Sequence, residues 1–116
     1  MHADEGQDKA FVLLGGKIKT PPMSEKARRE IGDLLRTLQR GENLSLPHSW
    51  PMPSIGPRCH ELRVQDENRI WRVVYRVDDD VIVVVEVFGK TTRETPRRVI
   101  EICQQRLRIW DKRRQE

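Results

Sequence analysis

The segment Arg58–Lys90 decides the fold, and it reads RCHELRVQDENRIWRVVYRVDDDVIVVVEVFGK. Three runs within it are rich in β-branched and aromatic residues, and the polar groups QDEN and DDD separate these runs. Residues of the first kind favour strands, and short polar segments between them favour turns. The segment therefore predicts three consecutive antiparallel strands.

Side chains alternate between the two faces of a strand, so the predicted sheet has two unlike faces. Turns of four residues at QDEN and three residues at DDD would place Arg72 between Glu61 and Glu86. One face is mainly apolar and is expected to pack on a core: His60, Leu62, Val64, Trp71, Val73, Tyr75, Val77, Val81, Val83, Val85 and Val87. The other face mixes charged and apolar residues: Cys59, Glu61, Arg63, Ile70, Arg72, Val74, Arg76, Ile82, Val84, Glu86 and Phe88. We expect this second face to be open to solvent and to hold the functional site.

Two further elements are predicted before these strands. Residues 10–19 (AFVLLGGKIK) predict a fourth strand beside the other three. Ser24 is a suitable helix N-cap, and an apolar stripe at helical spacing then runs to Gly41, where the helix should end. The members of this stripe are Ala27, Ile31, Leu34, Leu35 and Leu38. Residues 44–57 contain four prolines, so we expect a loop packed by its own side chains, with His48 on it.

A second helix is predicted after the strands. Thr95 is a candidate cap, Pro96 suits the first helical position, and the helix should end near Asp111. Its apolar stripe is Val99, Ile100, Cys103, Leu107 and Trp110. The sequence thus predicts an α+β fold in one domain, residues 10–113, with an antiparallel sheet of about four strands packed by one helix from each half of the chain. Residues 1–9 lack an apolar pattern, and we expect them to be disordered.

The composition excludes several classes of function. A chain of 116 residues has room for one domain. Lys and Arg outnumber Asp and Glu by 22 to 18, a small surplus, but arginines gather in and just after the predicted strands, and the planar guanidinium suits phosphate. No run approaches about 18 apolar residues, and the N-terminus is acidic and polar. We therefore expect a cytoplasmic protein without membrane contact.

Nothing in the sequence predicts a metal or a cofactor. Cys59 and Cys103 do not form a CxxC pair, and His48 and His60 lack a zinc-binding spacing. Both cysteines are expected to be buried, inert thiols. A Walker loop, a dinucleotide glycine fingerprint, an HExxH motif and a nucleophile elbow are absent.

The charged face could support RNA cleavage without a metal. This reaction needs a base for the 2′ hydroxyl, cations for the charge on the phosphorane, and an acid for the leaving 5′ oxygen. Arg63 and Arg72 can supply the cations. Glu61 is a candidate base, because a nearby phosphate raises the pKa of a carboxylate. The same residues could equally be cross-strand pairs that only stabilise the sheet, by about 0.2 to 1 kcal/mol each.

The loop GKTTRETPRR at residues 89–98 leads from the third predicted strand into the last helix. Unpaired amides at a helix N-terminus favour an anion. We expect Lys90, Arg93 and Arg97 to converge with Arg72 at this end of the sheet, as a site for phosphate.

Four segments, LPHSWPMPSIGPRCHELRV, IWRVVYRV, VFGK and TTRETP, resemble the HigB-like, phage-related branch of the RelE/ParE toxin superfamily. The resemblance covers residues 11–111. It implies a RelE-like fold and the toxin of a type II toxin–antitoxin pair. In RelE and HigB relatives, the concave sheet face binds messenger RNA in the ribosomal decoding site and cleaves it without metal, and a cognate antitoxin blocks that face.

The resemblance also implies site residues. The family's strand arginine corresponds to Arg72, and its basic loop corresponds to Lys90 and Arg93. RelE has lysines where Cys59 and Glu61 stand here, and a tyrosine where Arg97 stands, so the catalytic set must differ. The candidate catalytic residues are Glu61, Arg63, Arg72, Lys90 and Arg93, with His48 or the less favoured His60 as proton carrier. The candidate RNA-binding residues are Arg58, Arg76, Arg97 and His48.

Three functions stay open. The first is a ribosome-dependent endoribonuclease that cleaves messenger RNA and inhibits translation. The second is a ParE-like inhibitor of DNA gyrase, and the third is an inactive phage-derived binding module. The resemblance further implies a helix-turn-helix antitoxin as partner, messenger RNA and the ribosome as targets, and contact with operator DNA only through the antitoxin.

Overall fold

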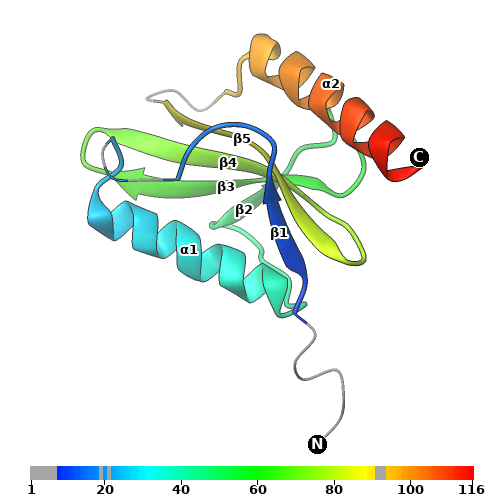
Figure 1. Ribbon diagram of the computed structural model, residues 1–116. Coiled ribbons are helices and arrows are strands. Elements are labelled where there is room, and N and C mark those ends of the chain that lie inside the picture. Colours follow the sequence, from blue (N-terminus) through cyan, green and yellow to red (C-terminus); the bar gives the residue numbers. More distant parts are fainter. Residues whose placement is uncertain (1–7, 19, 21, 91–93) are drawn as a thin grey trace, which may run out of the picture.

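The computed structural model describes residues 8–18, 20, 22–90 and 94–116, with residue 90 described by its backbone alone. A five-stranded sheet lies between two helices, which cover its opposite faces (Figure 1). The elements, in chain order, are β1 (Ala10–Leu13), α1 (Glu25–Gln39), β2 (Ser49–Pro51), β3 (Cys59–Asp66), β4 (Arg69–Val77), β5 (Val81–Lys90) and α2 (Arg97–Arg114). The predicted α+β architecture, with one helix from each half of the chain, is confirmed.

The sheet has the order β1-β5-β4-β3-β2, and two details differ from the prediction. β1 pairs with β5 in parallel, whereas an antiparallel fourth strand was expected. Ser49–Pro51, within the proline-rich segment, forms a short fifth strand that pairs with β3. β2 lies at the sheet edge, where a proline is tolerated because its missing N–H costs no ladder hydrogen bond.

The three central strands form the predicted meander, but their register differs. Asp66 pairs with Arg69, so the first turn has two residues instead of four. The ladder therefore shifts by two positions, which leaves every side chain of β3 and β4 on its predicted face. A β-bulge at Val74 and Tyr75 then shifts the pairing of β4 with β5, and Arg72 lies opposite Phe88. The predicted pairing of Arg72 with Glu86 is wrong.

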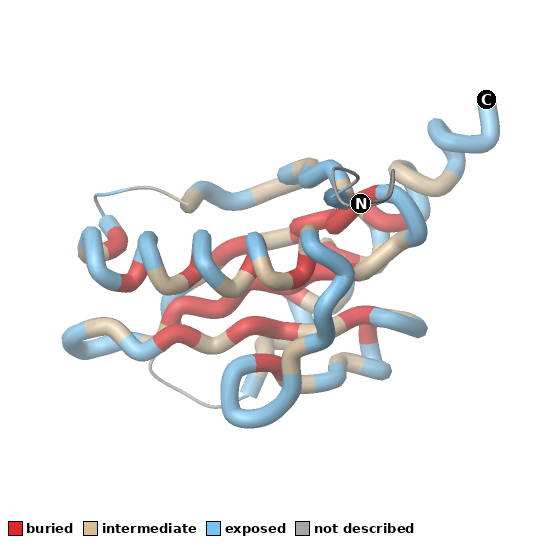
Figure 2. The backbone as a smooth tube through the Cα atoms, turned by 90° about the horizontal axis from the view of Figure 1, so that it is seen from below, coloured by how far each residue is buried: buried red, intermediate tan, exposed pale blue. Residues whose placement is uncertain are grey.

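The bulge also changes which face the first half of β5 presents to each helix. Ile82 and Val84 join the core beneath α1, whereas Val81, Val83 and Val85 face α2. One extra residue in a ladder reverses the alternation on one side of it. Buried residues are concentrated in the strands of the sheet (Figure 2).

Each face of the sheet consequently has its own apolar core. The core under α1 contains Met23, Ala27, Ile31, Leu35, Leu38, Leu62, Val64, Trp71, Val73, Tyr75, Ile82, Val84 and Val87. The core under α2 contains Ile55, Cys59, Val74, Val81, Val83, Val85, Val99, Cys103 and Leu107. The expectation that the second face is open to solvent is wrong, because the apolar stripe of α2 packs on the valines that the bulge turns toward it.

The start of the described chain is tied to the end of α1 and to the turn between β4 and β5. The backbone nitrogen of Lys9 donates to the carbonyl of Gln39 at 2.8 Å, and its Nζ donates to the carbonyl of Asp78 at 2.6 Å. The predicted disorder of residues 1–9 otherwise falls on residues 1–7, outside the described part of the chain. No helix within that part is long and apolar enough to cross a membrane.

Candidate functional site

The carboxylate of Glu61 connects three elements of the fold. Its Oε1 accepts hydrogen bonds from Nη1 of Arg72 at 2.8 Å and from Nε of Arg63 at 2.9 Å. Its Oε2 accepts from Oγ1 of Thr95 at 2.7 Å. One buried carboxylate therefore links β3 and β4 to Thr95, in the segment that precedes α2.

Strand periodicity explains why these side chains meet. Glu61 and Arg63 are two residues apart on β3, so they point to the same face, and Arg63 is the register partner of Arg72 on β4. Two adjacent guanidinium groups repel each other unless an anion lies between them. Glu61 supplies this anion, and both Glu61 and Arg72 are completely buried.

A cleft of about 940 Å³ opens above this cluster. Residues from five segments line it: His48 and Trp50 from the β2 region, Arg63 from β3, Ile70 and Arg72 from β4, Glu30 from α1, and Thr95 and Ile100 around the start of α2. The cleft lies on the side of the sheet that α2 covers, at the end where α2 begins. Three other pockets in the described part of the chain have volumes of only about 310, 370 and 330 Å³.

Arg63 is held in the cleft by two contacts. Its guanidinium carbon lies 4.2 Å from the centroid of the Trp50 ring, and Glu61 fixes its Nε. The Trp50 ring is itself anchored, because Nε1 donates to the carbonyl of Pro47 at 3.1 Å. About one fifth of the Arg63 side chain is exposed. The cleft thus presents a fixed planar cation beside an aromatic ring.

Residues 22–108 match the family described as Phage derived protein Gp49-like (DUF891). The chain belongs to this family. It is a family of HigB-like toxins from toxin–antitoxin pairs, and the match includes Trp50, Arg63, Arg72 and Thr95. No curated protein matches the chain.

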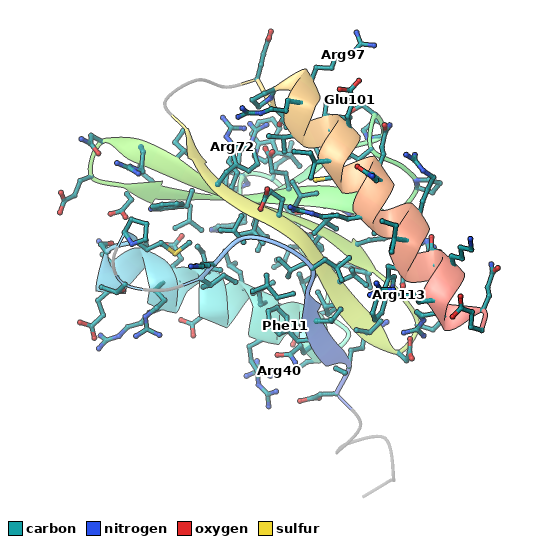
Figure 3. All side chains as sticks on the ribbon, turned by 45° about the horizontal axis from the view of Figure 1, so that its top comes forward. Phe11, Arg40, Arg72, Arg97, Glu101 and Arg113 are labelled. Atoms are coloured by element: carbon teal, nitrogen blue, oxygen red, sulfur yellow. The ribbon has the colours of Figure 1, made fainter. Side chains whose placement is uncertain are left out.

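The Gp49-like chain does not expose two of its predicted catalytic residues. Arg72 lies inside the molecule between the sheet and α2 (Figure 3), and Glu61 already accepts three hydrogen bonds. Arg72 reaches the floor of the cleft without exposing surface to solvent. The expectation that both residues stand on an open floor is wrong, and in this structure they position Arg63 and Thr95.

Arg58 and Arg76, two of the predicted RNA-binding residues, lie elsewhere. Arg76 is buried and makes two hydrogen bonds to each of two carboxylates, Asp78 and Asp111. The hydrogen bonds from Arg76 lower the pKa of Asp111. Arg58 is exposed beside Asp78. Arg76 is four residues along β4 from Arg72, about 13 Å away at strand rise, so neither residue belongs to the cleft.

The basic loop is only partly described in this Gp49-like structure. Arg97 is exposed at the start of α2, points away from the sheet (Figure 3), and lies 3.7 Å from Glu101. The backbone of Lys90 pairs with Ile70, but its side chain and the whole of Arg93 lie outside the described residues. The predicted convergence of Lys90 and Arg93 with Arg72 therefore stays a prediction.

The two candidate proton carriers, His48 and His60, lie in different surroundings. His60 faces the α1 side, as the alternation predicted, and its ring stacks on Tyr75 with centroids 5.5 Å apart. His48 is exposed on the rim of the cleft, and its carbonyl accepts from the backbone nitrogen of Arg63 at 3.0 Å. Of the two, His48 is the one placed to meet a ligand in the cleft.

The predicted burial of the two cysteines is confirmed. Cys59 and Cys103 are both buried and form no disulfide. Burial raises the pKa of Cys59 and raises that of Cys103 to about 12, which keeps both thiols protonated and unreactive. Across residues 8–18, 20, 22–90 and 94–116, no group of three or more His, Cys, Asp or Glu side chains is arranged to hold a metal ion.

Sequence reasoning missed two members of the site. Thr95 was expected to cap α2, but the helix begins at Arg97 with Pro96 at the N-cap, and the Thr95 hydroxyl turns to Glu61. Trp50 was assigned to a packed loop. Only its pairing with β3, which brings Trp50 opposite Glu61 in the register, places the ring against Arg63.

Proposed function

We propose that this Gp49-like protein is the toxin of a type II toxin–antitoxin pair and cleaves messenger RNA on the ribosome without a metal. The observation that carries the proposal is the contact of Arg63 with Trp50 in the cleft. A guanidinium group binds phosphate oxygens in a two-pronged geometry, and an aromatic ring stacks on a nucleobase. One nucleotide engages both groups when its phosphate meets Arg63 and its base meets Trp50.

The reaction needs charge stabilisation and proton transfer. The 2′ hydroxyl gives its proton to a base as its oxygen forms a bond to phosphorus. The bond to the 5′ oxygen breaks, and this oxygen takes up a proton from an acid or from water, which leaves a 2′,3′-cyclic phosphate. Among the described residues, Glu61 is the one acceptor of the Arg63 side chain, so its terminal nitrogens remain available for the phosphorane. Histidine is suited to proton transfer near neutral pH, which assigns His48 to this role.

The buried residues act through Arg63 and α2. Glu61 fixes the plane of Arg63 and holds Thr95, while Arg72 neutralises Glu61 from below. A charge that is fixed before the reaction stabilises a transition state more than a mobile one, because no reorganisation is needed. Glu61 and Arg72 are thus positioning residues in this proposal.

The partner we propose is a helix-turn-helix antitoxin. Part of it covers the cleft and is acidic or apolar, which complements Arg63 and Trp50. The toxin contacts operator DNA only through this antitoxin. Membership of the Gp49-like family supports the pairing.

The test is message cleavage in a reaction containing ribosomes, mapped by primer extension. Wild-type protein is expected to cut the message, and Arg63→Ala is expected to slow cutting by about 10²–10³-fold, the typical effect of removing one preorganised donor. Trp50→Ala is expected to weaken binding by about 1–3 kcal/mol, whereas Trp50→Phe retains most of the stacking.

Arg58→Ala is the matched control. Arg58 is also an exposed arginine, but it lies at the far end of β3 from the cleft, so cutting should continue at the wild-type rate. Intact message with ribosomes present would refute the nuclease proposal. Inhibition of gyrase supercoiling in that case would replace it with the ParE-like alternative.

A further inference from the structure

The positive charge of the protein is concentrated on one helix. α2 contains seven basic and two acidic residues, a formal charge of +5, whereas the whole chain has a charge of +4. All other residues together therefore carry a charge of −1. By contrast, α1 has four basic and three acidic residues. The basic character of the chain is a property of α2.

Part of this charge is neutralised by neighbours. Three basic side chains form ion pairs: Arg97 with Glu101, Arg106 with Glu86, and Arg114 with Asp80. The remaining four meet no acidic side chain in the described part of the chain, and all are exposed: Arg98, Arg108, Lys112 and Arg113. We call these four residues the α2 basic face.

The α2 basic face points away from the sheet. At 3.6 residues per turn, its four residues fall within about 140° of the helix circumference. The residues that α2 buries, Val99, Cys103 and Leu107, lie on the opposite side. From Arg98 to Arg113 the face spans about 22 Å at helical rise. Four cations thus form a stripe on a rigid support.

The end of α2 that carries Arg98 borders the cleft. Thr95 and Ile100 line the cleft, and Arg98 lies between them in the chain. Figure 3 shows Arg97 and Arg113 at the two ends of the helix, with Arg72, which lines the cleft, toward the Arg97 end. A nucleic-acid strand that leaves the cleft past the start of α2 would therefore meet the α2 basic face next.

We propose that the α2 basic face binds the phosphate backbone of RNA outside the cleft, as a second contact surface that holds the toxin on a folded RNA. The inference rests on the proposed function and extends it from the cut nucleotide to the surrounding RNA. Phosphate contacts of this kind position a protein without reading sequence. They also make binding strongly dependent on salt, because each one releases counterions.

An acidic protein segment fits this face less well. Protein interfaces have an apolar or aromatic centre from which charged residues are depleted. The outer surface of α2 offers one large exposed apolar side chain among the described residues, that of Ile109. Interfaces with nucleic acid are more polar and far more positively charged, and Arg and Lys supply most phosphate contacts.

The experiment measures binding of the full chain to a fluorescein-labelled RNA hairpin by fluorescence anisotropy, between about 50 and 200 mM KCl. The test variant changes Arg98, Arg108, Lys112 and Arg113 to Gln. The matched control changes Lys26, Arg28, Arg29 and Arg36 of α1 to Gln, which removes the same formal charge. The plot of log affinity against log salt should become shallower by about 3 to 4 for the test variant and by less than about 1 for the control.

Two further variants keep the test decisive if the four simultaneous substitutions disturb folding. Replacing Arg98, Arg108 and Arg113 by Lys retains the charge and should retain the salt slope. The double change Arg98→Gln and Arg108→Gln should make the slope shallower by about 2. Circular dichroism checks that each variant is folded.

Three results would overturn the inference. They are an unchanged slope for the test variant, an equal loss for the α1 control, and tighter binding of a matched DNA duplex than of the RNA hairpin. Message cleavage is measured separately with Arg63→Ala, which keeps the α2 basic face. A protein that binds RNA through α2 yet cuts nothing would refute the proposed nuclease function and not the α2 surface.

Discussion

Nη1 of Arg72 lies 2.8 Å from Oε1 of Glu61, and neither side chain has exposed surface. Removing Glu61 takes a charged partner from the buried guanidinium of Arg72 in a medium of low dielectric. Glu61→Ala should therefore lower the free energy of unfolding by about 3–5 kcal/mol, as measured by urea denaturation. The double variant Glu61→Leu with Arg72→Met should lose less than Glu61→Ala alone, because no buried charge remains. A loss below about 1 kcal/mol for Glu61→Ala would contradict the pairing.

Arg76 should matter for stability and not for RNA cleavage. It makes two hydrogen bonds to Asp111, at 2.7 and 3.0 Å, and two to Asp78, at 2.8 and 2.9 Å. Arg76→Gln is expected to reduce the free energy of unfolding by about 2 kcal/mol and to leave the cleavage rate per folded molecule unchanged. Arg58→Gln, which loses a more exposed ion pair, should cost less than about 1 kcal/mol. A lower cleavage rate per folded molecule for Arg76→Gln would show that Arg76 belongs to the functional site.

Asp66 should make stability fall in acid. It accepts hydrogen bonds from the backbone nitrogen of Ser24 at 3.0 Å and from Nε1 of Trp71 at 2.9 Å. These bonds hold the pKa of the carboxyl well below its ordinary value. The folded pKa is below the unfolded value of about 3.9, so the stabilisation is present above that pH and is lost as the pH falls below it.

Asp66→Asn should therefore lower the melting temperature at pH 7, and its deficit relative to wild type should shrink below about pH 4. Thermal unfolding followed by circular dichroism at both pH values measures the change. The exposed Asp79→Asn is the control and should show no such trend. A deficit that is the same at both pH values would show that the carboxylate charge is not the cause.

Gly16 should tolerate a side chain less well than Gly41. Both have positive φ angles, +83° and +90°. An added Cβ at Gly16 would lie 2.4 Å from the backbone nitrogen of Val87, whereas one at Gly41 would meet nothing within 4 Å. Gly41→Ala should cost about 1–2 kcal/mol through φ alone, and Gly16→Ala at least about 3 kcal/mol, because the β5 backbone must also move. Equal losses in urea denaturation would argue against this close approach.

Several features of the site could be predicted from the sequence. The alternation of side chains along β3 and β4 placed Glu61, Arg63 and Arg72 on one face of the predicted sheet. The predicted register was wrong by two residues, which did not change that result. The helical stripes of α1 and α2 were also correct. These features depend on the spacing of residues a few positions apart, and this spacing can be read directly from the sequence.

Other features could not be predicted because they depend on contacts between distant segments. The bulge at Val74 and Tyr75 reverses which side chains of the first half of β5 lie on each face of the sheet. The position of the bulge is known only from the pairing of β4 with β5. Trp50 reaches Arg63 through the short pairing of β2 with β3, which the prolines around it gave no reason to expect.

The sequence alone determined the meander, the two amphipathic helices and the face on which the arginines and Glu61 lie, since each follows from local periodicity. Only the tertiary structure decided that α2 covers this face, that Arg72 is buried with Glu61, and that Arg63 is partly exposed in the cleft. The physical reason is that alternation divides a strand into two faces, whereas burial depends on which of them has enough apolar surface for a helix to pack on it.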